Sequence, residues 1–158
     1  MRLAVVSDIH ANRHAYEAVL EDIARHEAEE MWCLGDVVGY GAEPNACVEL
    51  TREFAAVALA GNHDLAVCSE LSIEEFSPGA SLAVRWTQER IRPENAAYLL
   101  GLQPQNTDEV VGLFHASPRD PVWEYVLSAL QAEICLDEQE HRISIVGHSH
   151  VALAFSRV

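Results

Sequence analysis

The sequence lacks lysine, and all ten of its basic side chains are arginine. Aspartate and glutamate together number 25, so the formal net charge is −15. No run of basic residues is present, which argues against a nucleic-acid-binding face and against a polybasic membrane anchor. The acidic balance leaves phosphate chemistry open, because bound divalent cations reverse the local charge.

Long apolar runs and paired-cysteine motifs are also missing. No hydrophobic run approaches the length of a membrane span, and no signal peptide is visible at the N-terminus. The four cysteines have no CxxC spacing, which indicates reduced, mostly buried thiols rather than disulfides or a thiolate metal site. These absences predict a cytoplasmic protein that does not bind membranes.

Hydrophobic residues make up 49 % of the 158 residues, enough to form a sizeable core. Short apolar runs rich in β-branched residues alternate with helical patterns. Strands are expected over residues 3–6, 31–34, 55–60, 110–114, 142–146 and 151–155, helices over residues 13–26, 45–53, 78–91, 93–100 and 128–138, and a turn over residues 104–107. The early part of this order indicates parallel βαβ units with right-handed crossovers. No repeat or linker is visible, so we expect a single α/β domain over residues 1–158.

Five of the expected strands end at a residue that can bind a metal. The endings are Asp8-Ile9-His10, Gly35-Asp36, Gly61-Asn62-His63-Asp64, His115 and Gly147-His148-Ser149-His150. Ligands of open α/β sheets lie beyond the carboxyl ends of the strands, so these side chains are expected to meet in one site. Carboxylate, amide and imidazole groups without an obvious thiolate suit Mn, Fe, Zn or Ni. We infer a two-metal centre.

In this order, the motifs resemble those of the calcineurin-like metallophosphoesterase superfamily, and the resemblance covers nearly the whole chain. Residues 35–41 and 115–121 look like the small bacterial and archaeal phosphodiesterase branch. The resemblance implies a β-sandwich flanked by helices, in four αββα layers. Relatives continue with more strands, so we expect a second sheet that is incomplete at the C-terminus. An unpaired sheet edge over residues 151–158 would favour either oligomerisation, for example as a homo-oligomer, or instability.

The resemblance implies metal roles for seven residues. The first ion would be held by Asp8, His10, His150 and Asp36, and the second by Asp36, Asn62, His115 and His148. Two divalent ions bring about +4, and two aspartates and a bridging hydroxide remove three units, which leaves about +1 to hold a phosphate. The bridging hydroxide would attack phosphorus directly, without a covalent enzyme intermediate.

Other residues have expected roles around the metals. By the same resemblance, His63 would stabilise the transition state or protonate the leaving oxygen, and Asp64 is a candidate to orient it. Arg119 is a candidate phosphate ligand, with a loop salt bridge as the alternative. Tyr40 is a candidate pocket residue, with packing as the alternative. Trp123 is expected in the core or in a lid.

One difference between this sequence and the family motifs narrows the range of expected activities. Protein Ser/Thr phosphatases of the superfamily carry Asp-Arg-Gly where this chain has Gly39-Tyr40-Gly41, which argues against that activity. We expect a phosphoesterase with two divalent ions, Mn first and Fe, Zn or Ni as alternatives, acting on phosphodiesters or small nucleotide-like phosphates. Diadenosine-polyphosphate hydrolase and phosphomonoesterase remain open. A non-catalytic scaffold of the same fold is a further alternative, although the complete ligand set argues against it.

Overall fold

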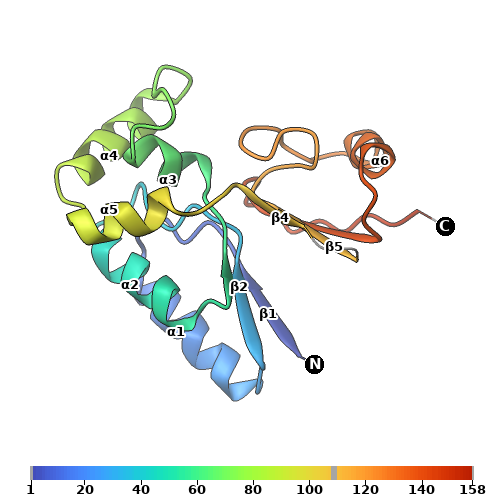
Figure 1. Ribbon diagram of the computed structural model, residues 1–158, viewed down its shortest axis with the longest axis horizontal. Coiled ribbons are helices and arrows are strands. Elements are labelled where there is room, and N and C mark those ends of the chain that lie inside the picture. The colour runs from blue at the N-terminus through green and yellow to red at the C-terminus, as the bar shows by residue number, and fades with distance from the viewer. Residues whose placement is uncertain (1, 108–109, 158) are drawn as a thin grey trace.

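Two three-stranded sheets lie face to face in the computed structural model, which describes residues 2–107 and 110–157 (Figure 1). The first sheet is parallel and has the order β1 (Leu3–Val6), β2 (Glu30–Cys33), β3 (Val57–Ala58). In the second sheet β4 (Gln105–Thr107) is antiparallel to β5 (Val111–Phe114), which is parallel to β6 (Ile143–Val146). The expected α/β architecture of two sheets flanked by helices is confirmed, and the second sheet is small.

The helices lie on the outer sides of the two sheets (Figure 1). Beside the first sheet are α1 (Arg13–Arg25), α2 (Pro44–Phe54), α3 (Asn62–Val67), α4 (Pro78–Gln88) and α5 (Pro93–Leu100), and beside the second is α6 (Ala129–Glu138). Three of these helices begin at a capping residue, because the side chains of Asn12, Ser77 and Ser128 accept backbone N–H bonds at the starts of α1, α4 and α6. No described helix has the length and apolarity needed to cross a bilayer.

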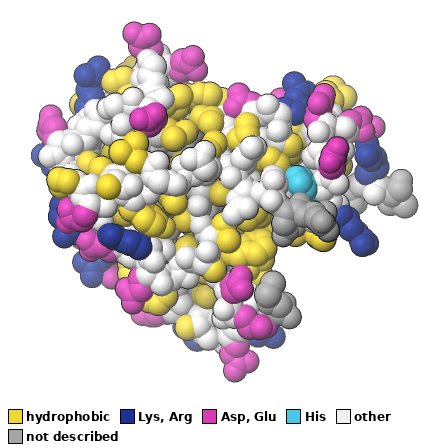
Figure 2. Space-filling view, in the orientation of Figure 1, with side chains coloured by type: hydrophobic (Ala, Val, Ile, Leu, Met, Phe, Trp, Pro, Cys, Tyr) yellow, Lys and Arg dark blue, Asp and Glu magenta, His cyan; other side chains and the backbone are white. Residues whose placement is uncertain are grey.

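The side chains of β2 alternate between two hydrophobic clusters. Met31 and Cys33 point toward the helices and pack in a cluster that includes Tyr16. Trp32 points the other way, into a cluster that joins Leu34 of the first sheet to Leu113 of the second. This period of two is typical of a strand buried on both faces. Figure 2 shows hydrophobic side chains gathered where the two sheets meet and charged side chains around them.

Some element predictions are wrong, and each error has a tertiary cause. The strand expected over residues 55–60 is only two residues long, since the Ala60 N–H leaves the sheet and donates to the Gln103 carbonyl. The turn expected over residues 104–107 contains β4, which pairs with β5. The short helix α3 was not expected.

The strand expected over residues 151–155 is absent. Ladder pairing of β6 stops at Val146, and the backbone then turns through left-handed conformations at His148 and His150. The segment that follows is not paired as a strand, although Leu153 and Phe155 line a pocket together with Ile143 and Val146 of β6. Residue 158, the last of the expected sheet edge, lies outside the described residues.

Candidate metal centre

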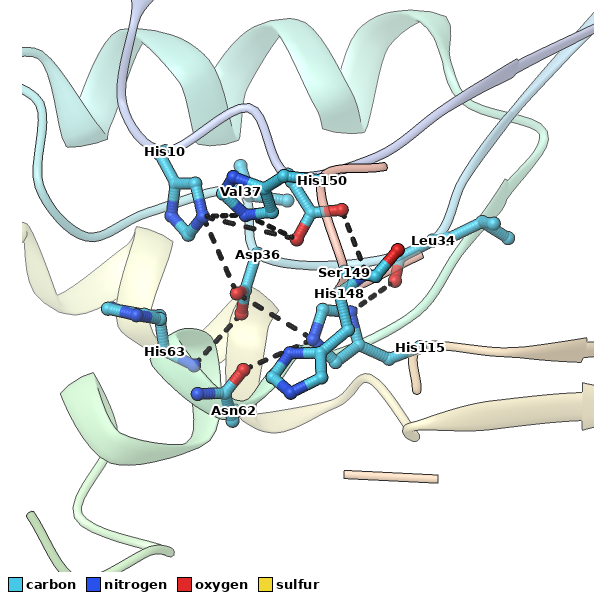
Figure 3. A network of polar contacts seen from close by, with 12 residues as sticks. His10, Leu34, Asp36, Val37, Asn62, His63, His115, His148, Ser149 and His150 are labelled. Carbon is cyan, nitrogen blue, oxygen red and sulfur yellow. Dashed lines mark hydrogen bonds and ion pairs between the residues drawn. The ribbon is translucent and has the colours of Figure 1, made fainter. Parts of the chain in front are cut away.

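All seven side chains expected to bind metal come together where the carboxyl ends of the two sheets meet (Figure 3). The loops after β1, β2, β5 and β6 and the start of α3 supply them. Backbone contacts hold these loops together, because the Gly147 N–H donates to the His115 carbonyl at 2.9 Å and the His148 N–H donates to Asp8 Oδ2 at 3.0 Å. The meeting of the strand ends was predictable, and the structure shows that both sheets contribute to it.

A first group of donors consists of Asp8, His10 and His150. The Nε2 atoms of the two histidines are 3.1 Å apart, and His150 Nε2 is 3.3 Å from Asp8 Oδ1. The Nδ1 atom of His10 hydrogen-bonds to the Val38 carbonyl, which turns the lone pair of Nε2 toward the group. Asp8 Oδ1 is buried and accepts no hydrogen bond from the described residues. Such an orphaned carboxylate oxygen fits a cation ligand.

A second group consists of Asp36, His115 and His148, with Asn62 beside it. His115 Nε2 lies 3.6 Å from Asp36 Oδ2 and 3.2 Å from Asn62 Oδ1. The other ring nitrogen of His115 bonds to the Leu34 carbonyl at 2.8 Å. His148 Nε2 is buried and has no partner among the described residues. The group therefore presents nitrogen and oxygen lone pairs to a common point.

Asp36 stands between the two groups. Its Oδ2 is 3.7 Å from His10 Nε2 and 3.6 Å from His115 Nε2, while its Oδ1 accepts the His63 backbone N–H at 2.9 Å. Burial, followed by the charges of Asp64 and Asp8, raises the pKa of Asp36 well above its ordinary value. A cation on each side would relieve this cost of burying a carboxylate.

Burial also lowers the pKa of four imidazoles at the site. The pKa of His148 falls to about 4 and that of His63 to about 3, mainly through desolvation and then through neighbouring histidines. Desolvation likewise lowers the pKa of His10 and His115. Neutral imidazoles are the form that binds metal, so the donor set fits two divalent cations.

The backbone at the site is strained. Among the described residues, nine that are not glycine have positive φ. Five of these nine are expected metal ligands: Asp8, His10, Asp36, His148 and His150. Left-handed conformations are unfavourable for residues with a Cβ and are common at functional sites. The strain concentrates where the donors must converge.

His63 lies beside the donors, and Asp64 does not orient it. The carboxylate of Asp64 accepts backbone N–H bonds from Gly61, Val37 and Val38 at 3.0 to 3.2 Å. The Nδ1 atom of His63 is buried and has no hydrogen-bond partner among the described residues. The expected contact between the two side chains is therefore wrong, because Asp64 instead fixes the loop after β2 and the start of α3.

Two glycines allow these close approaches, and our sequence analysis missed both. A Cβ at Gly61 would overlap the Asp36 carboxylate, with Cγ only 2.6 Å away. Gly39 has φ of +91°, and a Cβ there would overlap the His63 ring. Gly61 directly precedes Asn62, and Gly39 directly precedes Tyr40. A glycine next to an expected site residue is the sequence signal that could have identified both positions.

A pocket of about 400 Å³ opens over the donors. Tyr40 lines it, as expected, together with Phe76, Trp123 and Tyr125, of which only Trp123 was considered from the sequence. Arg119 is not among the residues that line this pocket, and its Nε lies 3.6 Å from a Glu124 carboxylate oxygen. The salt-bridge alternative for Arg119 is the one that the structure shows.

The family model for the calcineurin-like phosphoesterase superfamily domain matches residues 1–157. The chain belongs to this superfamily. The candidate histidine and aspartate metal-binding groups agree with a family of metallophosphoesterases, so the family resemblance seen in the motifs is confirmed.

The chain is similar to a curated protein and to two solved structures from three organisms. The chain is 37 % identical over 154 residues to an uncharacterised protein of Methanocaldococcus jannaschii, covering 94 % of this chain and 62 % of that protein. A metallophosphoesterase structure from Sphaerobacter thermophilus matches with a TM-score of 0.84 at 41 % identity, covering 96 % of this chain and 61 % of that one. A hypothetical protein from Pyrococcus horikoshii has the same fold, with a TM-score of 0.79 at 21 % identity and coverage of 91 % and 68 %. The chain thus spans about three fifths of the length of the first two relatives.

Proposed function

We propose that the chain is a phosphoesterase with two divalent metal ions and that it hydrolyses phosphodiesters. The observation that carries the proposal is the position of Asp36, whose carboxylate lies between two groups of histidine nitrogens and oxygen donors. Two ions, when bound there, would lower the pKa of water and neutralise the charge of a phosphate ester.

The residues of the chain then have separate tasks. The first group of donors and Asn62, His115 and His148 hold the ions, with Asp36 shared between them. The neutral ring of His63 lines the pocket, where its N–H would donate a hydrogen bond that stabilises the negative charge of the transition state. Tyr40 packs against the His63 ring, with centroids 4.6 Å apart, and limits its movement.

The charge of the pocket supports a diester substrate. No arginine is present in its lining among the described residues, and Glu75 adds a carboxylate. The positive charge that attracts substrate would therefore come from the ions alone, reduced by the aspartates. A diester carries one negative charge, whereas a phosphomonoester carries about −1.5 to −2 at neutral pH. The single negative charge of a diester therefore suits this pocket better than the larger negative charge of a monoester or a polyphosphate.

A metal-titrated hydrolysis assay tests the proposal. The chain is stripped with chelator, and Mn, Fe, Zn, Ni or Mg is added back separately. We expect metal-dependent cleavage of bis(p-nitrophenyl) phosphate above p-nitrophenyl phosphate, with Mn as the first choice. Cleavage of neither ester by the folded chain with any metal would contradict the proposal and favour the scaffold alternative.

The setting of the activity is also a proposal. Four free cysteines support a reducing, cytoplasmic compartment. The exposed apolar side chains of Val151, Leu153 and Phe155 support a homo-oligomer, although they do not form the sheet edge expected from the sequence. A small phosphate ester is the proposed partner of the metal centre.

A further inference from the structure

Four aromatic rings line the pocket, and we call them the aromatic wall: Tyr40, Phe76, Trp123 and Tyr125. They come from three segments, the loop after β2, the turn before α4 and the loop between β5 and α6. The rings of Phe76 and Trp123 are 5.1 Å apart, and Phe76 is 5.0 Å from the His63 ring. The wall is thus continuous with the candidate catalytic histidine.

Tyr125 differs from Tyr40, the more exposed tyrosine of the wall, because it stacks face to face on a histidine. One face of its ring stacks on His148 with a centroid distance of 4.2 Å and an interplanar angle of 22°. The residue is nevertheless 48 % exposed, so much of the ring remains open. A large aromatic face left exposed beside polar donors is typical of a ligand-binding surface rather than of packing.

The loop that carries Trp123 and Tyr125 is held by buried hydrogen bonds. Ser117 Oγ is the centre of this network, accepting the Asp120 N–H at 3.0 Å and donating to Glu124 at 2.5 Å. The Asp120 carboxylate in turn accepts the Trp123 N–H at 3.1 Å. The ring of Tyr125 therefore projects from a preorganised segment, which lowers the entropic cost of binding a ligand against it.

We propose that Tyr125 is the stacking platform for a nucleobase attached to the phosphodiester, so that the enzyme prefers nucleoside esters to alkyl esters. Every nucleobase has a flat π face that can stack on an exposed aromatic ring. The Glu75 carboxylate in the same pocket can accept hydrogen bonds from a ribose hydroxyl or an exocyclic amine, which a plain alkyl group lacks. Only the catalytic test of this inference rests on the proposed function, because the binding test does not require hydrolysis.

The catalytic test uses two diesters with the same leaving group, thymidine 5′-p-nitrophenyl phosphate and methyl p-nitrophenyl phosphate. We expect kcat/KM of the unaltered chain to be about tenfold or more higher for the thymidine ester. Tyr125→Ala should remove most of this preference, chiefly through KM, and Tyr125→Phe should retain it because the ring remains. Phe54→Ala, which truncates an aromatic residue that is 49 % exposed and absent from the pocket lining, is the matched control.

Two results would overturn the platform. The first is equal kcat/KM for the two esters in the unaltered chain. The second is an equal loss on both esters in Tyr125→Ala together with a lower metal content, because Tyr125 would then only support His148.

A binding test separates failure of the platform from failure of the proposed function. The fluorescence of 2-aminopurine riboside 5′-monophosphate decreases when its base stacks, and it can be titrated with the zinc-loaded chain. We expect saturable quenching that weakens about tenfold in Tyr125→Ala and persists in Tyr125→Phe. Absence of quenching by the unaltered chain would contradict the proposal even if esters are cleaved. Quenching without cleavage of any ester would support the platform and reject the hydrolase.

Discussion

His63 is surrounded by rings that fix its position without using its nitrogens. Its ring lies 4.9 Å from His10, 4.6 Å from Tyr40 and 5.0 Å from Phe76. Its backbone N–H, in contrast, donates to the carboxylate shared by the two donor groups. The side chain is thus placed by packing, and its proton remains available for chemistry.

His63→Ala should therefore keep the metals and lose turnover. We expect kcat to fall by about 10²- to 10³-fold, the usual loss when one hydrogen-bond donor to the transition state is removed, while metal content stays at the unaltered level. Metal analysis and steady-state kinetics on the same samples measure both. His26→Ala, which removes a surface histidine on the far end of α1, serves as the control. Turnover that is unchanged in His63→Ala would reject the assigned role.

His150 combines a left-handed backbone with a side chain that is 54 % exposed. A residue with a Cβ is disfavoured in this conformation by about 1–2 kcal/mol, whereas glycine adopts it freely. His150→Gly should thus have a free energy of unfolding about 1 kcal/mol higher than His150→Ala in the metal-free chain. Both variants should lose metal from the first group of donors.

Urea denaturation of the two variants in chelator measures the difference in their free energy of unfolding. Metal analysis measures how much metal each variant has lost. A glycine variant no more stable than the alanine variant would mean that the backbone at residue 150 stores no strain.

At the scale of the elements, the start of α3 approaches the loop after β2 very closely. Gly61 leaves no room for a side chain, because a Cβ would overlap the Asp36 carboxylate. Gly61→Ala should destabilise the chain by about 2 kcal/mol and weaken metal binding, since Asp36 must move. Thermal unfolding and metal titration test both effects.

The matched control is Gly79→Ala in α4, where a Cβ would meet nothing within 4 Å. Alanine in a helix is favoured over glycine by up to about 1 kcal/mol, so this variant should be as stable as the unaltered chain or more so. Equal stability of the two variants would contradict the close approach at Gly61.

Elements determined by local chemistry were predictable, and those determined by distant contacts were not. Capping residues and prolines identified the helix starts, as Ser77 and Pro78 did for α4. β4 escaped prediction because the polar segment Gln105–Thr107 is a strand only through its pairing with β5. The segment over residues 151–155 has a strand-like pattern but forms no strand pairing in the described part of the chain.

The residues of the site can likewise be divided into those that were predictable from the sequence and those that were not. Its donors could be predicted because each lies directly after an apolar run. The partners of Asp64 and the open face of Tyr125 could not, since both depend on how separate loops meet. Composition gave no signal that distinguishes an aromatic residue in a pocket from one in a core.

For the whole molecule, the candidate centre joins the two sheets. Asp8, His10 and Asp36 follow strands of the first sheet, while His115 and His148 follow strands of the second. Metal that binds only the folded chain should stabilise it by about 2.7 kcal/mol at a free concentration one hundred times Kd, equivalent to a rise in Tm of about 5–10 °C.

Differential scanning calorimetry with added Mn or Zn, and then with chelator, measures this rise. Asp36→Asn should abolish most of it, because the shared carboxylate is lost. An identical Tm of the unaltered chain in metal and in chelator would show that the donors do not bind metal in the folded state.

The spread of the donors along the chain also bears on how the protein is made. A ribosome releases the chain from its amino terminus, so Asp8, His10 and Asp36 emerge long before His148 and His150. Until these last two histidines appear, neither expected group of donors is whole, and the growing chain offers only part of a site to cations in the cell. A complete set of donors is therefore available only after residue 150 has been synthesised.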